Sequence, residues 1–170
     1  REISEVIKSG EVTFLDFHRE SPDHPIFLEL IVPILKEQDG GLPIGVVILR
    51  INPETYLYPL IQSWPTDSRT AETLLVRRQG DDVLFLNELK FRKNTALNLR
   101  LSLKQRDDLP AAMAVTGIEG IVEGKDYRGI PVVACVRAVP DSPWFLVSRM
   151  DVSEVYAPLR ERLWMMIFLV

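Results

Sequence analysis

The stretch GIVEGKDYRGIPVVACVRAVPDSPWFLVSRM, residues 120–150, contains three runs rich in branched and aromatic side chains. The runs are separated by Arg128-Gly129 and by Pro140-Asp141-Ser142-Pro143, and both separators consist of residues that favour tight turns. Such runs predict strands, which pair antiparallel when short turns connect them. The expected strands are Gly120–Tyr127, Ile130–Val139 and Trp144–Met150.

Two more strands are predicted upstream of this stretch, at residues 72–78 and 83–89. The sequence Gln79-Gly80-Asp81-Asp82 between them is a hairpin signal, with alternating faces on either side. Residues 90–115 lose this alternation and contain two short helical candidates, one of which starts at Asp107-Asp108-Leu109-Pro110. The order is therefore strand, strand, helical crossover and three strands, which is the order of a PAS-like antiparallel sheet.

The N-terminal part of the chain predicts the end of a helix followed by a three-stranded meander and a short helix. The strands are expected at residues 12–18, 26–32 and 44–51, and the short helix starts at Asn52-Pro53. Residues 65–70 are polar and turn-rich, as expected of a boundary between two lobes. We predict an incomplete first lobe at residues 1–65, a second lobe at 66–155 and an exit segment at 156–170.

The C-terminal residues Leu163–Val170 form an uncharged apolar run. Asp151-Val152-Ser153-Glu154 has the spacing of a capping box, and apolar residues continue from it at helical intervals into this run. We therefore expect a helix that leaves the second lobe and enters a membrane. A spanning helix needs about 20 apolar residues, so a terminal helix or strand packed on the core is the alternative. Arg160 and Arg162 also argue against an exterior location under the positive-inside tendency.

Composition argues against several classes of function. The net charge of -4 is not gathered into blocks of one sign, so no nucleic-acid partner is expected. The single cysteine, Cys135, allows no intrachain disulfide, and its apolar neighbours predict that it is buried. The sequence contains no nucleophile elbow, paired-histidine zinc helix, phosphate-binding glycine loop or paired cysteines. We therefore expect neither an enzyme nor a bound cofactor.

Three stretches resemble the Cache family of extracellular sensor domains, which occur in bacterial histidine kinases, chemoreceptors and diguanylate cyclases. Residues 31–34 with 41–47 and 51–53 are similar to the closing hairpin and exit helix of a membrane-distal Cache lobe. Residues 123–132 are similar to the hairpin of a membrane-proximal lobe, and Pro143–Val147 with Asp151 and Glu154 to its last strand and exit helix. The resemblance implies an α+β fold of PAS-like antiparallel sheets with flanking helices, in two lobes.

The same resemblance implies a function in signalling. We expect the periplasmic sensor module of a membrane-anchored receptor, most simply a two-component histidine kinase, that binds a small organic carboxylate or amino acid and signals through its C-terminal helix. A homodimer is a further expectation. The alternative is a structural or protein-interaction domain that binds no small molecule and supports receptor dimerisation.

Five residues are candidate ligand contacts. Arg50, Arg77 and Arg137 end or interrupt apolar strands, where a guanidinium at the edge of a pocket binds an organic anion, or else extends into solvent. Asp126 and Tyr127 lie with Arg128 in a predicted hairpin, where they could close over a carboxylate. The alternative for this hairpin is a turn with a surface salt bridge.

A metal site is considered at Asp16, His18 and Glu20, which share one face of a predicted strand. Asp23 and His24 follow in the next loop. A solvent-exposed strand face with a polar turn explains the same pattern, and we predict no metal site.

Overall fold

A computed structural model of the chain describes residues 2–21, 23–36, 43–104, 107–160 and 162. It confirms an α+β protein made of antiparallel sheets and a few short helices. The chain divides into two compact units, residues 1–60 and 61–170, which are described separately below. Whether these units correspond to a partial distal lobe and a proximal lobe stays a prediction.

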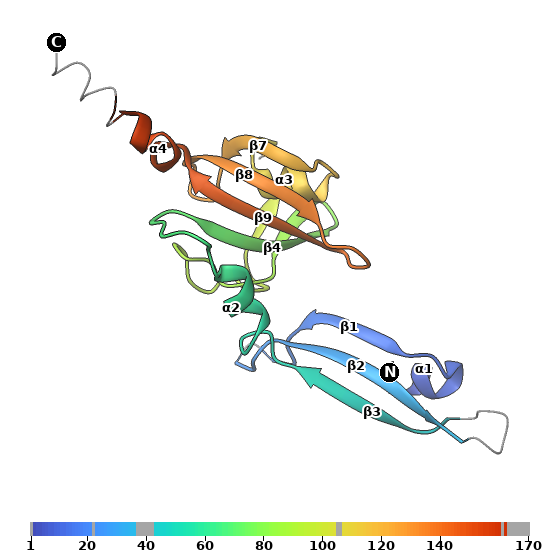
Figure 1. The fold of residues 1–170 in the computed structure, drawn as a ribbon. Helices are drawn as coiled ribbons and strands as arrows, with labels where there is room; N and C mark the ends of the chain where they lie inside the picture. Colours follow the sequence, from blue (N-terminus) through green and yellow to red (C-terminus); the bar gives the residue numbers. More distant parts are fainter. Residues whose placement is uncertain (1, 22, 37–42, 105–106, 161, 163–170) are drawn as a thin grey trace, which may run out of the picture. The chain divides into compact units, whose positions relative to one another are not determined.

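The first unit is a three-stranded antiparallel sheet with one helix against it (Figure 1). Its buried side chains include Val6 of the helix, Phe17 and Ile31, and the Phe17 ring stacks on Tyr58 with centroids 6.3 Å apart. Many apolar side chains of the third strand are exposed, among them Ile44, Leu49 and Ile51. The elements are α1 (Glu2–Ser9), β1 (Thr13–His18), β2 (Phe27–Leu35) and β3 (Pro43–Ile51), in the sheet order β1-β2-β3.

The short helix α2 (Leu57–Gln62) starts later than the sequence predicts. Asn52 and Pro53 form turns instead: Asn52 Oδ1 accepts a hydrogen bond from Glu54 N at 2.9 Å, and Pro53 O accepts one from Tyr58 N at 2.9 Å. The asparagine therefore caps a turn, and regular helix begins only after it.

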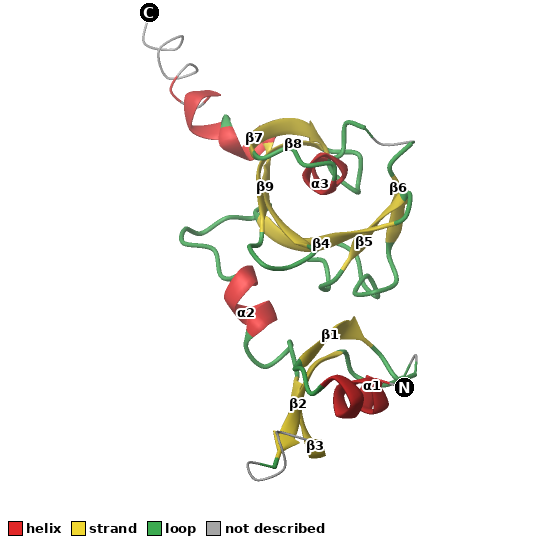
Figure 2. Ribbon diagram, turned by 90° about the vertical axis from the view of Figure 1, so that its right-hand side faces the viewer, coloured by secondary structure: helices red, strands yellow, loops and turns green. Residues whose placement is uncertain are grey.

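The second unit is a six-stranded antiparallel sheet in the order β6-β5-β4-β9-β8-β7. Figure 2 shows this sheet curling around α3, which lies in its hollow. The first and last long strands, β4 and β9, pair at the centre, as the PAS-like order predicts. The elements are β4 (Glu72–Gln79), β5 (Asp82–Phe85), β6 (Arg100–Ser102), α3 (Pro110–Val115), β7 (Gly120–Lys125), β8 (Pro131–Ala138), β9 (Trp144–Asp151) and α4 (Val152–Val155).

The core of the second unit lies between α3 and the hollow face of the sheet. Side chains that alternate along the strands, such as Val76, Phe85, Val136 and Val147, bury there against Ala111 and other residues of α3. Gly80 has φ of 63° in the β4–β5 hairpin, a left-handed conformation that glycine adopts without strain.

Two features differ from the predictions. Cys135 is exposed, because its neighbours Ala134 and Val136 occupy the buried face of β8 and the strand alternates. Strand β6 was not predicted, since a three-residue strand leaves little periodicity to detect.

Among the described residues, none of the helices has both the length and the apolar character to cross a bilayer. The predicted apolar run at residues 163–170 lies outside the described part of the chain.

Candidate ligand-binding site

Six polar side chains meet at one end of the hollow face of the second unit, and we call them the Arg149 cluster. They are unusual because charged groups are rarely buried unless they are paired. Arg149 is 1% exposed and Asp126 is 2% exposed. The members of the cluster are Glu72, Asp126, Tyr127, Arg128, Arg149 and Asp151.

Strand register and one hairpin bring these side chains together. Glu72 of β4 and Arg149 of β9 are direct cross-strand partners. Arg149 and Asp151 are two residues apart, and the period of two places both on the face that Val147 occupies in the core. Asp126–Gly129 form the β7–β8 turn, in which Gly129 has φ of 82° and donates its N–H to Asp126 O at 2.9 Å.

Arg149 is the centre of the cluster. Its Nη2 donates to Glu72 Oε2 and lies 3.2 Å from Asp126 Oδ2, and its Nη1 donates to Asp151 Oδ1 at 3.0 Å. Nη1 also donates to the main-chain oxygen of Thr70 at 3.2 Å. One guanidinium therefore ties β4, β9, the β7–β8 turn and the segment before β4 to one another.

Arg128 and Tyr127 complete the network. Arg128 Nε donates to Asp126 Oδ2 at 2.6 Å and its Nη2 to Asp151 Oδ1 at 2.5 Å, while Tyr127 Oη donates to Glu72 Oε2 at 2.9 Å. Burial, together with the nearby charge of Glu72, raises the pKa of Tyr127 well above its usual value. Burial works to lower the pKa of Arg128, but hydrogen bonds to Asp126 and Asp151 outweigh it and raise that pKa.

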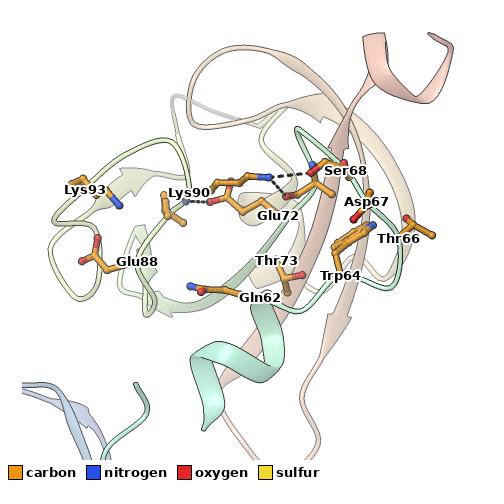
Figure 3. Close-up of a pocket in the computed structure, with 12 residues that line it drawn as sticks. Gln62, Trp64, Thr66, Asp67, Ser68, Glu72, Thr73, Glu88, Lys90 and Lys93 are labelled. Atoms are coloured by element: carbon orange, nitrogen blue, oxygen red, sulfur yellow. Dashed lines mark hydrogen bonds between the residues drawn. The ribbon is translucent and has the colours of Figure 1, made fainter. Parts of the chain in front are cut away.

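Glu72 of the Arg149 cluster also lines a cavity of about 530 Å³. Figure 3 shows the residues that line this cavity. Its volume is within the range of small-molecule sites, roughly 300–1,000 Å³. Residues 62–73 form one part of its wall and residues 88–93 the other. The lining residues are Gln62, Trp64, Thr66, Asp67, Ser68, Ala71, Glu72, Thr73, Glu88, Leu89, Lys90 and Lys93.

Helix α4 is bonded to the wall of this cavity through Glu154. The Glu154 carboxylate accepts hydrogen bonds from Ser68 Oγ at 2.9 Å, from Arg69 N at 3.0 Å, from Thr70 N at 2.8 Å and from Thr70 Oγ1. The hydrogen bond from Thr70 and the others from this segment lower the pKa of Glu154 to about 2. Ser68 also lines the cavity, so the segment 68–70 contacts both the cavity and α4.

The predicted capping box at Asp151–Glu154 is therefore wrong. Asp151 is the residue before α4, but its side chain makes no capping hydrogen bond and pairs with Arg128 and Arg149 instead. Glu154 likewise binds the segment 68–70 rather than the start of its own helix. Donors brought by tertiary structure outcompete the local partners that the sequence pattern implies.

The structure brings two of the five predicted ligand contacts into this region. Asp126 and Tyr127 belong to the Arg149 cluster, and their burial shows that a surface salt bridge is the wrong description of their hairpin. Arg50 lies in the first unit, where it binds Glu29 at 2.7 Å and Glu20 at 2.7 Å. Arg77 of β4 and Arg137 of β8 are absent from the cavity wall described above, and Arg137 is exposed.

The side chains considered for a metal make other contacts. His18 Nδ1 lies 2.9 Å from the main-chain oxygen of Asp16, and His18 Nε2 lies 3.8 Å from Glu29 Oε2. Glu20 binds Arg50. Within the described part of the chain, no three His, Cys, Asp or Glu side chains are grouped so that they could hold a metal ion.

Sequence reasoning missed Glu72, Arg149 and Asp151 as members of one site. A signal was present, because Arg149 and Asp151 have the same strand parity as the buried Val147. A charged residue at an inward position of a strand predicts a buried partner, but the partner Glu72 lies 77 residues away and is identified only by the strand pairing.

No protein-family model matches the sequence, and no curated protein matches it. The fold is similar to that of several ligand-binding domains of chemoreceptors and extracellular domains of putative histidine kinases. One is the ligand-binding domain of the Pseudomonas aeruginosa PAO1 amino acid chemoreceptor PctB in complex with L-Arg, with a TM-score of 0.56 and 21% identity over 91% of this chain and 60% of that one. Another is the extracellular domain of the putative histidine kinase mmHK1S-Z3, with a TM-score of 0.60 and 15% identity over 93% of this chain and 55% of that one.

The ligand-binding domain of Mlp24 with asparagine is a third similar structure, with a TM-score of 0.58 and 11% identity over 93% of this chain and 58% of that one. This chain thus spans less than two thirds of the length of each of these structures. Two of the three are ligand-binding domains, and the third is the extracellular domain of a putative histidine kinase. The chain therefore shares the fold of these domains, as the sequence resemblance predicts.

Proposed function

We propose that this chain is the extracytoplasmic sensor module of a membrane-anchored bacterial signalling receptor, most simply a histidine kinase. It binds a small organic molecule, and the bound state changes the position of the C-terminal helix, which continues into the membrane. Catalysis belongs to another part of the receptor. The sensor fold shared with chemoreceptor and histidine kinase domains supports this proposal.

The observation that carries the proposal is the bonded path from the cavity to α4. Ser68 lines the cavity and donates to Glu154 of α4, and Thr70 accepts a hydrogen bond from Arg149 at its main-chain oxygen. A ligand that moves the segment 68–70 therefore moves contacts of both α4 and the end of β9. Such a coupling needs only that the ligand has different affinities for the two positions of the segment.

The test is a thermal-shift screen of the purified chain with carboxylates, amino acids and amines. A ligand present at about 100 times its Kd stabilises the folded state by about 2.7 kcal/mol, which is a readily measured rise in Tm. Hydrogen exchange with a hit should then show protection in residues 66–71 and 151–155. A screen without any stabilising compound would argue against a ligand sensor.

A role in dimer assembly is the second candidate, and the exposed apolar side chains of β3 favour it. Ile44 is 66% exposed and Leu49 is 50% exposed, and β3 is an edge strand of its sheet. Unpaired edges with apolar side chains favour association with another chain. Sedimentation velocity over a range of concentrations tests this role. If the chain stays monomeric at every concentration and binds a ligand, the dimer-assembly role is excluded and the sensor function is retained.

A further inference from the structure

Five charged side chains line the cavity of the second unit, but two of its three carboxylates are already occupied. Glu72 accepts from Arg149, from Tyr127 Oη and from the main-chain N–H of Lys90 at 2.5 Å. Glu88 accepts from the main-chain N–H groups of Thr95 at 3.2 Å and of Ala96 at 3.2 Å. These two carboxylates therefore have little capacity left for a ligand.

The two lysines of the cavity are in the opposite situation. Among the residues that the structure describes, the acceptors of Lys90 Nζ are the main-chain oxygens of Ser68 at 3.4 Å and Ala71 at 3.3 Å, and the ammonium lies 5.5 Å from the centre of the Phe91 ring. No carboxylate in the described part of the chain forms an ion pair with Lys90 or Lys93. An ammonium has three donors and prefers a charged acceptor, so both lysines retain capacity for an anion.

We propose that this cavity binds a small organic carboxylate through Lys90 and Lys93. The inference rests on the proposed sensor function and specifies the ligand chemistry of that site. Trp64, on the part of the wall formed by residues 62–73, offers an apolar surface to the rest of the molecule (Figure 3). Asp67 lies on the same part of the wall and is exposed, so it repels a second carboxylate and accepts a hydrogen bond from an amino group.

The same lysine connects binding to the output helix. Lys90 donates to the main-chain oxygens of Ser68 and Ala71, and a ligand carboxylate competes for this ammonium because a positive donor binds a negatively charged acceptor more strongly than a neutral one. When Lys90 turns to the ligand, the segment 68–70 loses a contact at Ser68, and the adjacent residue Ala71 loses another. The contacts of α4 therefore differ between the ligand-bound and the empty cavity.

The experiment compares carboxylates with their uncharged counterparts on the whole chain. The probes are acetate, pyruvate, pentanoate, benzoate and the common amino acids, each with its amide, together with 2-aminopentane as an amine without a carboxylate. We expect at least one carboxylate to raise Tm while its amide does not. Calorimetry on that compound should show affinity losses of about tenfold or more in Lys90→Met and in Lys93→Met, the size expected for one charge-assisted hydrogen bond.

Lys104→Met is the matched control. Lys104 pairs with Asp81 on an exposed part of the same unit, away from the cavity, and its removal changes net charge equally. Binding of amides or amines alone, or equal losses in all three lysine variants, would overturn the carboxylate assignment and leave the sensor function standing. If no compound raises Tm, the result would count against both the carboxylate assignment and the sensor function. Lys93 is exposed and its variant should fold normally, which keeps the test valid if Lys90→Met is unstable.

Discussion

Replacing Arg149 by methionine should be the most damaging single change to the second unit. Methionine keeps much of the volume of the arginine stem but removes the guanidinium that contacts Glu72, Asp126 and Asp151. The side chains of these three acids are 4%, 2% and 8% exposed, so water cannot replace the lost partner without a rearrangement. Arg128 still pairs with Asp126 and Asp151. Glu72, in contrast, keeps two uncharged donors, the Tyr127 hydroxyl and the main-chain N–H of Lys90.

The expected loss follows from this burial. Removing one partner of a buried ion pair costs about 3–5 kcal/mol, because it leaves an uncompensated buried charge. Since Arg128 compensates part of the charge, we expect the lower end, about 3 kcal/mol. That is a large fraction of the stability of an ordinary domain, about 5–15 kcal/mol. It corresponds to a fall in Tm on the order of 10 °C.

The assay is urea denaturation of the whole chain at neutral pH, followed by tryptophan fluorescence and circular dichroism. Arg137→Met is the matched control, because Arg137 is exposed on β8 and its loss should change the free energy of unfolding by no more than about 0.5 kcal/mol. Glu72→Gln is a milder variant, expected to cost about 1–3 kcal/mol through the same network. Equal stability of the Arg149 and Arg137 variants would refute this account of the cluster.

Two further variants test the path to α4 and the packing of the sheet. Glu154→Gln should loosen the segment 68–70; because the pKa of Glu154 is lowered from 4.5 to about 2, its contribution is fully present above pH 4.5 and is lost as the pH falls towards 2. Urea denaturation at several pH values should thus show wild type and Glu154→Gln converging near pH 2, and a constant difference would contradict it. Gly124→Ala should lower the free energy of unfolding by about 1–3 kcal/mol, because a Cβ at this position would lie 2.0 Å from Asp108 O. Gly45→Ala is the control and should be tolerated, because a Cβ there would lie 3.8 Å from the nearest atom.

The position of Glu72 links the stability of the second unit to its proposed function. This carboxylate belongs to the Arg149 cluster and also lines the cavity, where it accepts the main-chain N–H of Lys90. The cluster therefore keeps the two parts of the cavity wall, residues 62–73 and 88–93, in register with each other. Variants of Arg128 or Arg149 that still fold should therefore weaken binding at the proposed site, although neither residue lines the cavity.

Most of the strands could be predicted because their signal is local. Alternation along residues 120–150, together with the turns at Gly129 and at Pro140–Pro143, predicts β7, β8 and β9 to within a few residues. Strand β6 has only three residues and α2 is preceded by turns, so neither start could be found from periodicity. The exposure of Cys135 was mistaken because an apolar run does not reveal which of its alternate positions face the core.

The sequence by itself determined the α+β class, the PAS-like order of strands and a polar hairpin at Asp126 and Tyr127, because side-chain periodicity and turn residues act over a few neighbouring positions. Tertiary structure decided the site. Glu72 meets Arg149, and Glu154 meets the segment 68–70, only after the strands pair. A local pattern such as the capping box at Asp151–Glu154 cannot anticipate these partners, since a carboxylate binds the donors that the folded chain brings nearest.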